Sequence, residues 1–209
     1  MELRYDKLGP RVVKALENRF FQAWYFSDIT EVVEKVFSLI PKTDTVSWGG
    51  SLTTTGLNLT ALAAEKGYKV IDRDKAQSPE ERVELMRQAL LCDTYLTGTN
   101  AITEDGQLVN VDGNGNRVAA MIYGPKQVIV VAGMNKVVQT ISDAATRVRT
   151  IAAPANMQRF PNLIAPCNET GACADCLTAD SICSFIVRTR ICKPKGRIKV
   201  ILVGKDLGL

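Results

Sequence analysis

Four cysteines near the C-terminal end of the chain are spaced as the ligands of one metal centre would be. Cys167, Cys173, Cys176 and Cys183 are separated by five, two and six residues. A Cys-x2-Cys pair brings two thiolates to one centre through a tight loop, and flanking cysteines complete a set of four soft ligands. Such a set suits an iron–sulfur cluster, with zinc as the alternative. Thiols buried as small apolar residues are the other interpretation, and they account better for a lone Cys92 than for the cluster.

The chain contains no histidine. A Ser-His-Asp relay, a Cys-His relay, a histidine metal ligand and a histidine base are therefore all excluded. Any metal must be held by thiolate or oxygen. Proton transfer falls to Asp, Glu, Lys, Tyr, Cys or a bound cofactor.

A glycine pair stands between a predicted strand and a predicted helix in the segment SWGGSLTTTG, Ser47–Gly56. Glycine lets the backbone approach an anion closely, and the first amides of a helix are free to donate to it. We therefore expect a cradle for a phosphate or a carboxylate, formed by Gly49, Gly50, Ser51 and Thr53. A tight turn followed by an ordinary helix cap is the alternative. The pattern is neither a Walker motif nor a dinucleotide-binding fingerprint.

The segment GTNAITEDGQLVNVDGNGNR, Gly98–Arg117, holds more polar side chains than a structural hairpin needs. A hairpin rich in turns is the alternative, because Asn and Asp suit positive φ. Lys126 and Lys136 flank the apolar run QVIVVAG, and a lysine at the carboxyl end of a buried strand can bind an anion in the crevice of an open α/β sheet. The resulting ligand-binding candidates are Asn100, Thr103, Asp112, Asn116, Arg117 and Lys136.

Strands that alternate with helices must position these groups. The patterns predict strands at 20–26, 44–48, 69–72, 127–133 and 197–204, and helices at 8–18, 28–40, 51–66, 79–91 and 137–151. Two further strands, 93–103 and 108–112, are joined by a turn at Asp105-Gly106, which favours an antiparallel hairpin. The order predicts an α/β fold with a mostly parallel twisted sheet, helices on both faces and one antiparallel hairpin.

Length and charge bound the rest. With 209 residues, 46% of them apolar, the chain can bury one sizeable α/β domain. The net charge of +4 is mild, and its densest basic run, Arg188–Lys199, is interpreted as a solvated strand flank, so we expect no nucleic-acid partner. The N-terminal residues interleave charges with apolar side chains, and no run of about eighteen apolar residues occurs. We therefore expect a cytoplasmic protein with no membrane partner, in which a disulfide knot is the weakest interpretation of the cysteines.

Several segments together resemble the LUD domain family, the LutC/YkgG-like proteins of lactate utilisation. They are WGGSLT, TGTNAITEDGQLVNVDGNGNRVAAMIYGPKQVIVVAGMNKV, APANMQR, and the cysteine-bearing tail with TGACADC and ICSF. The resemblance covers nearly the whole chain. It implies a NagB/RpiA/CoA-transferase-like fold and a role in the oxidation of lactate to pyruvate alongside iron–sulfur partner proteins. By analogy with CoA transferases of similar fold, Glu104 is the candidate nucleophile, and we take Lys126 as its catalytic companion.

The sequence-based hypothesis is a component of an organic-acid redox system that binds a small anionic metabolite. A free-standing transferase or isomerase acting on a CoA ester or a sugar phosphate is one alternative. A non-enzymatic assembly or regulatory subunit with a structural four-cysteine zinc site is another. We expect an α/β core over residues 1–160 and a cysteine-bearing tail over 161–209 that returns a final strand to the core, and a homo-oligomer stays open.

Overall fold

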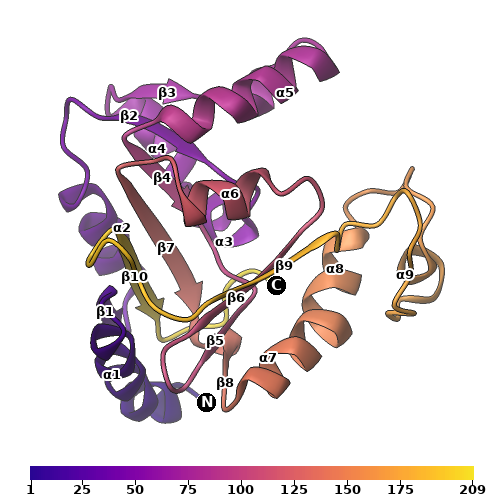
Figure 1. Cartoon of the computed structure of the whole chain (residues 1–209). Coiled ribbons are helices and arrows are strands. Elements are labelled where there is room, and N and C mark those ends of the chain that lie inside the picture. The colour runs from indigo at the N-terminus through magenta and orange to yellow at the C-terminus, as the bar shows by residue number, and fades with distance from the viewer.

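A six-stranded, entirely parallel sheet forms the centre of the computed structural model, which describes residues 1–209 (Figure 1). From one edge to the other its strands are β1 (Gln22–Phe26), β10 (Ile198–Val203), β7 (Gln127–Gly133), β4 (Thr94–Thr97), β2 (Thr45–Trp48) and β3 (Lys69–Ile71). The α/β fold class with a parallel sheet is thus confirmed.

Both faces of the sheet are buried. Along β7, Val128 and Val130 pack in one core with α1 (Glu2–Asn18) and α6 (Asn116–Ile122). Ile129 and Val131 pack in a second core with α2 (Ile29–Ser38) and α4 (Leu59–Glu65). Burial on both faces explains the continuous apolar run QVIVVAG, because neither set of alternate side chains meets water. Between these elements, α3 (Leu52–Gly56) follows β2, and α5 (Pro79–Gln88) lies between the short helices η1 (Arg73–Lys75) and η2 (Ala89–Leu91).

A second, mixed sheet of four strands stands beside the first. Its order is β8 (Val137–Val138), β5 (Ala101–Thr103), β6 (Leu108–Asp112) and β9 (Phe185–Thr189). β5 and β6 form the predicted antiparallel hairpin. The short helix η3 (Met134–Lys136) leads into β8, and α7 (Ile141–Arg147) packs on this sheet through Ala144. A π-helical segment, η4 (Val148–Ala152), and α8 (Ala153–Met157) continue from α7, and α9 (Pro166–Thr170) begins the tail.

Four predicted elements differ clearly from the structure. The helix predicted at 8–18 begins six residues earlier, at Glu2. The predicted strand 93–103 is divided at Gly98–Asn100, so β4 joins the parallel sheet and β5 the mixed one. The predicted helix 51–66 is broken into α3 and α4, because Asn58 takes a left-handed conformation at φ 54. The predicted helix 137–151 begins only at Ile141, where Thr140 and Asp143 form a capping box.

Three helices were not predicted. Helix α8 lies in the segment APANMQRFPNLIAP, where the regular pattern breaks. Helix α6 begins at Asn116, directly after Gly115, whose φ of 77 ends the turn-rich DGNG segment. Because glycine and asparagine dominate that segment, its pattern indicates only turns. Helix α9 has five residues and shows no apolar period. None of the helices combines the length and the apolar character needed to cross a membrane.

The C-terminal residues complete the main sheet. Strand β10 lies between β1 and β7 and pairs with both in parallel. It buries side chains such as Val200 and Ile201 in the two cores. The tail therefore crosses the mixed sheet as β9 before its last strand enters the centre of the molecule (Figure 1).

Candidate functional site

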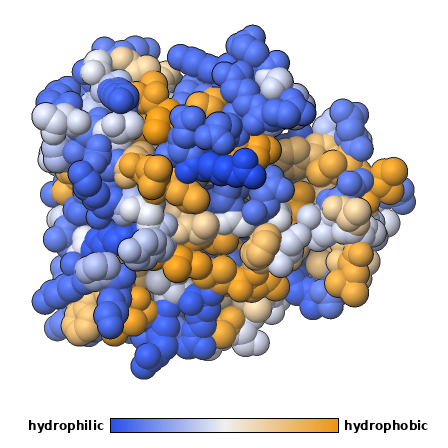
Figure 2. All heavy atoms as spheres, turned by 45° about the horizontal axis from the view of Figure 1, so that its top comes forward, coloured by the Kyte–Doolittle hydropathy of each residue, from blue (hydrophilic) through white to orange (hydrophobic).

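A cleft of about 630 Å³ opens outside the carboxyl ends of β2 and β4. Trp48, Gly49 and Gly50 line it from the end of β2, and Gly98 from the end of β4. Helix α8 and the tail segment 179–182 close the opposite side. Figure 2 shows hydrophilic side chains over α5 and apolar ones gathered on the tail. Crevices at this end of an open α/β sheet are where such folds bind ligands.

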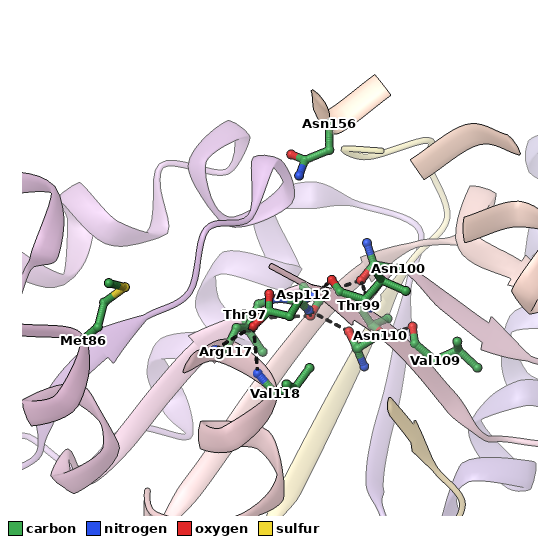
Figure 3. A network of polar contacts seen from close by, with 12 residues as sticks. Met86, Thr97, Thr99, Asn100, Val109, Asn110, Asp112, Arg117, Val118 and Asn156 are labelled. Atoms are coloured by element: carbon green, nitrogen blue, oxygen red, sulfur yellow. Dashed lines mark hydrogen bonds and ion pairs between the residues drawn. The ribbon is translucent and has the colours of Figure 1, made fainter. Parts of the chain in front are cut away.

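Arg117 organises the floor of the cleft. Its Nε donates to Asp112 Oδ1 at 3.2 Å, and Nη1 donates to Asn110 Oδ1 at 2.7 Å and to the Gly98 carbonyl at 3.5 Å. Its Nη2 donates to Asn100 Oδ1 at 2.9 Å and to the Val111 carbonyl at 2.7 Å. A guanidinium has five N–H groups, and all five are used inside the protein (Figure 3).

Two glycines allow this floor to pack. A Cβ on Gly49 would stand 2.8 Å from Arg117 Cγ, and one on Gly98 would stand 2.7 Å from Ser51 Oγ. Any side chain at either position would therefore displace the neighbouring residue. Gly49, the first residue of the Gly49-Gly50 pair, thus brings the backbone close to Arg117 as well as to the cleft.

Two further cations are buried beside Arg117. Lys136 is 4% exposed, lines the cleft and donates through Nζ to Thr53 Oγ1 at 3.0 Å. Arg147 is 7% exposed and donates to the carbonyls of Asn100, at 2.6 Å, and Asn135, at 3.2 Å. Neither forms an ion pair.

Burial alters the acid–base behaviour of both cations. Burial, followed by the nearby charges of Arg147 and Arg117, lowers the pKa of Lys136 to about 7. Burial also lowers the pKa of Arg147. A lysine with such a pKa can gain or release a proton near neutral pH.

Most of the predicted ligand-binding residues are brought together here. The cleft is lined by Gly49, Gly50, Ser51, Asn100, Asp112, Asn116, Arg117 and Lys136. Thr53 lies behind Lys136 as its hydrogen-bond acceptor. The Oδ1 atom of Asn100 accepts from Arg117 and from the Val111 amide, so its Nδ2 group points away from them, into the cleft (Figure 3).

Three predicted residues lie elsewhere. The Lys126 side chain is 83% exposed before β7, at the amino end of the sheet, where its Nζ lies 2.7 Å from Asp93 Oδ1. Glu104 follows β5 and faces a shallow depression beside α1. The hydroxyl of Thr103 accepts from the Gln107 amide inside the hairpin turn. Neither proposed catalytic side chain is therefore part of the cleft.

Several polar residues that line the cleft were not predicted from the sequence, among them Arg73, Arg82, Asn156 and Arg159. Arg73 and Arg82 stand in charged segments that look like solvated surface. Asn156 and Arg159 belong to the segment APANMQR, which carried part of the family resemblance, and that segment was the one available signal.

The four tail cysteines share one neighbourhood. Burial and then the charges of Cys173, Cys167 and Cys176 raise the pKa of Cys183 to about 11. Arg149, from η4, lies beside this group, since Cys173 and then Asp175 raise the pKa of its guanidinium. The donors fit a four-thiolate centre in number and kind. As they lie, however, no three His, Cys, Asp or Glu side chains are grouped closely enough to hold a metal ion.

Several solved structures are similar to this chain. A structure titled as a DUF162 family protein from Deinococcus radiodurans is similar over 95% of this chain and 97% of its own, with a TM-score of 0.56 and 15% identity. Ribose 5-phosphate isomerase A from Neisseria gonorrhoeae matches over 60% of this chain and 63% of its own, with a TM-score of 0.34 and 16% identity. The delta subunit of eIF2B from Chaetomium thermophilum matches over 52% and 48%, with a TM-score of 0.32 and 19% identity.

No curated protein matches the chain at a significant level. The family model of the LUD domain, in contrast, matches residues 9–203, on both sides of the predicted boundary at 160. The chain therefore belongs to the LUD domain family and is, in general terms, a protein of the lactate-utilisation type.

Proposed function

We propose that the cleft binds the carboxylate of a small organic acid and that the chain acts as a component of an organic-acid redox system. The observation that carries this proposal is the pair of buried cations, Lys136 and Arg147, which have no carboxylate partner. A buried charge without a counter-charge is costly, by several kcal/mol in typical cases. A bound carboxylate would offset that cost.

Three donors that line the cleft would bind such a ligand. Lys136 supplies the charge, and the Asn100 amide supplies an unpaired N–H donor. Asn156, from α8, is opposite (Figure 3). Oxidation of lactate to pyruvate releases two electrons and two protons. The electrons would pass to the iron–sulfur partner proteins that the family resemblance implies, and the protons to solvent. Lys136 stays protonated throughout, because its charge holds the carboxylate.

The tail cysteines are proposed to hold an iron–sulfur cluster through Cys167, Cys173, Cys176 and Cys183, with zinc as the alternative. The shared neighbourhood of the four thiols supports this assignment. A cluster would supply one-electron transfer. Metal analysis and a visible spectrum of protein purified without oxygen distinguish the two, because a cluster absorbs near about 400 nm and zinc is colourless. Protein that holds neither metal would contradict both.

The carboxylate proposal is tested by titrating lactate and pyruvate into the wild-type protein and into Lys136→Met. We expect a ligand to raise the melting temperature of the wild-type protein, since it binds only the native state. The methionine variant should lose that shift. Affinity should also fall above pH 7, by up to about tenfold per pH unit, as Lys136 loses its proton.

Lys126→Met is the matched control, because Lys126 is exposed and lies at the other end of the sheet. Its carboxylate binding should equal that of the wild-type protein. If Lys136→Met binds both acids as well as the control does, the inner end of the cleft is not a carboxylate site.

A further inference from the structure

Arg73, in η1, carries an unusually unpaired guanidinium. The side chain is 15% exposed, and its Nε atom is buried without a hydrogen-bond partner. Its Nη1 atom contacts only the sulfur of Met86, at 3.5 Å. Burying an unpaired N–H donor of a charged group costs free energy, and the protein supplies no acceptor for it. A bound ligand with an acceptor oxygen would remove that cost.

The nearest carboxylate does not satisfy Arg73. Asp74 Oδ1 lies 3.8 Å from Arg73 Nε, too far for a hydrogen bond. The same oxygen lies 3.0 Å from Nη2 of Arg82, its closer partner. The charge of Asp74 is therefore directed at Arg82, and Arg73 faces the cleft.

Two backbone amides beside this guanidinium are free. The N–H groups of Gly50 and Ser51 donate to no acceptor in the protein. A Cβ on Gly50 would stand 2.7 Å from Arg73 Nη2, so the missing side chain lets the guanidinium reach the backbone there. Helix α3 has only five residues, so its dipole adds little at this place.

We propose that Arg73 and the Gly50 and Ser51 amides form a subsite for a phosphate group at the mouth of the cleft. The ligand would then be a phosphate-bearing organic acid, with its carboxylate at Lys136. This second statement rests on the proposed function, whereas the phosphate subsite does not. Donors that approach from a planar fork and from two successive amides suit the three terminal oxygens of a phosphate better than a planar carboxylate.

Charge and size agree with this ligand class. Arg159 also lines the cleft and adds positive charge to it, whereas the charge of Arg82 is offset by Asp74. The hydroxyls of Thr55 and Thr60 are further donors in the lining of the cleft. At about 630 Å³ the cleft lies within the roughly 300–1,000 Å³ that holds drug-sized ligands, so a three-carbon acid alone would leave most of it empty.

Titration calorimetry with inorganic phosphate, at constant ionic strength set by chloride, tests the subsite. Wild-type protein should bind phosphate, and Arg73→Gln should weaken binding by about ten- to a hundredfold, which corresponds to the loss of charged hydrogen bonds. Gly50→Ala should weaken it as well, because the added methyl group displaces the guanidinium. Arg73→Lys, which keeps the charge without the fork, should fall between the wild-type protein and Arg73→Gln.

Two controls separate this proposal from the carboxylate site. Arg87→Gln removes an arginine that is exposed on α5 and should leave phosphate binding unchanged. Lys136→Met should keep phosphate binding within about twofold while it loses lactate and pyruvate. Phosphate binding that is absent from the wild-type protein, or equal in folded Arg73→Gln, would overturn the subsite. Loss of carboxylate binding alone would sink the proposed function and leave the subsite standing.

Discussion

At the scale of single residues, Arg117 shows how a correct location can carry a different role. The sequence predicts it as a ligand-binding residue, and it does line the cleft. Its five donors, however, are directed at the protein, including the paired carboxylate of Asp112. The structure indicates a positioning role, in which Arg117 holds Asn100 in place so that the free amide of Asn100 faces the cleft.

Arg117→Ala should therefore destabilise the whole protein. Removing one member of a buried ion pair leaves the other uncompensated, and we expect the free energy of unfolding to fall by about 3–5 kcal/mol. Urea denaturation measures this loss, with the exposed Arg87→Ala as the control, expected within about 0.5 kcal/mol of the wild-type protein. A variant that unfolds like the wild-type protein but no longer binds anions would show that Arg117 contacts the ligand instead.

The polar segment that the sequence singles out lines the cleft through Asn100, Asp112 and Arg117, which stand close along the chain. It cannot show which way each side chain points, since that depends on the turn between β6 and α6. The sequence also offers no sign of Arg73. Four of the five residues in Asp72–Ala76 are charged, a composition typical of solvated surface. Arg73 is nevertheless covered by Gly50 and Met86, which are distant from it in sequence.

At the scale of elements, local turn chemistry was predictable and strand membership was not. Asp105-Gly106 predicts the hairpin turn, and the structure has β5 and β6 antiparallel around it. The division of the preceding strand between two sheets depends on partners distant in sequence, β2 and β7 for the first half and β8 for the second. The local sequence around Gly98 does not predict which strands each half will pair with.

The hairpin turn between β5 and β6 requires a glycine for two reasons: its left-handed backbone conformation and its close contact with α1. Gly106 has a φ of 86, and a Cβ there would stand 2.5 Å from the Ala15 carbonyl carbon in α1. Gly67 has a φ of 77 with nothing within 4 Å of such a Cβ. Gly67→Ala should therefore cost about 1–2 kcal/mol from the left-handed conformation alone.

Gly106→Ala should cost that amount plus about 1–3 kcal/mol more, because the methyl group forces the hairpin away from α1. Chemical denaturation of the two variants measures the difference. If both variants lose the same free energy of unfolding, the hairpin and α1 move apart to accommodate the methyl group at no energetic cost.

At the scale of the whole molecule, the tail is part of the framework. The sequence divides the chain at residue 160, where the pattern becomes irregular and the cysteines begin. In the structure, residues beyond that point supply β9 to the mixed sheet and β10 to the parallel one. Strand β10 has partners on both sides, and five of its six side chains are buried. The irregular segment after residue 160 therefore belongs to the part of the chain that supplies one strand to each sheet.

A chain truncated after Phe160 should fail to fold cooperatively. It would lose β10 from between β1 and β7, so that two strand edges and the apolar side chains of both cores would meet water. Near-ultraviolet circular dichroism and a urea titration would show a collapsed state with no sharp transition. The full-length chain with Leu177→Ser is the control: this side chain of the tail is fully exposed, so the variant should unfold as the wild-type protein does. A truncated chain with a sharp transition of its own would instead establish residues 1–160 as an independent domain.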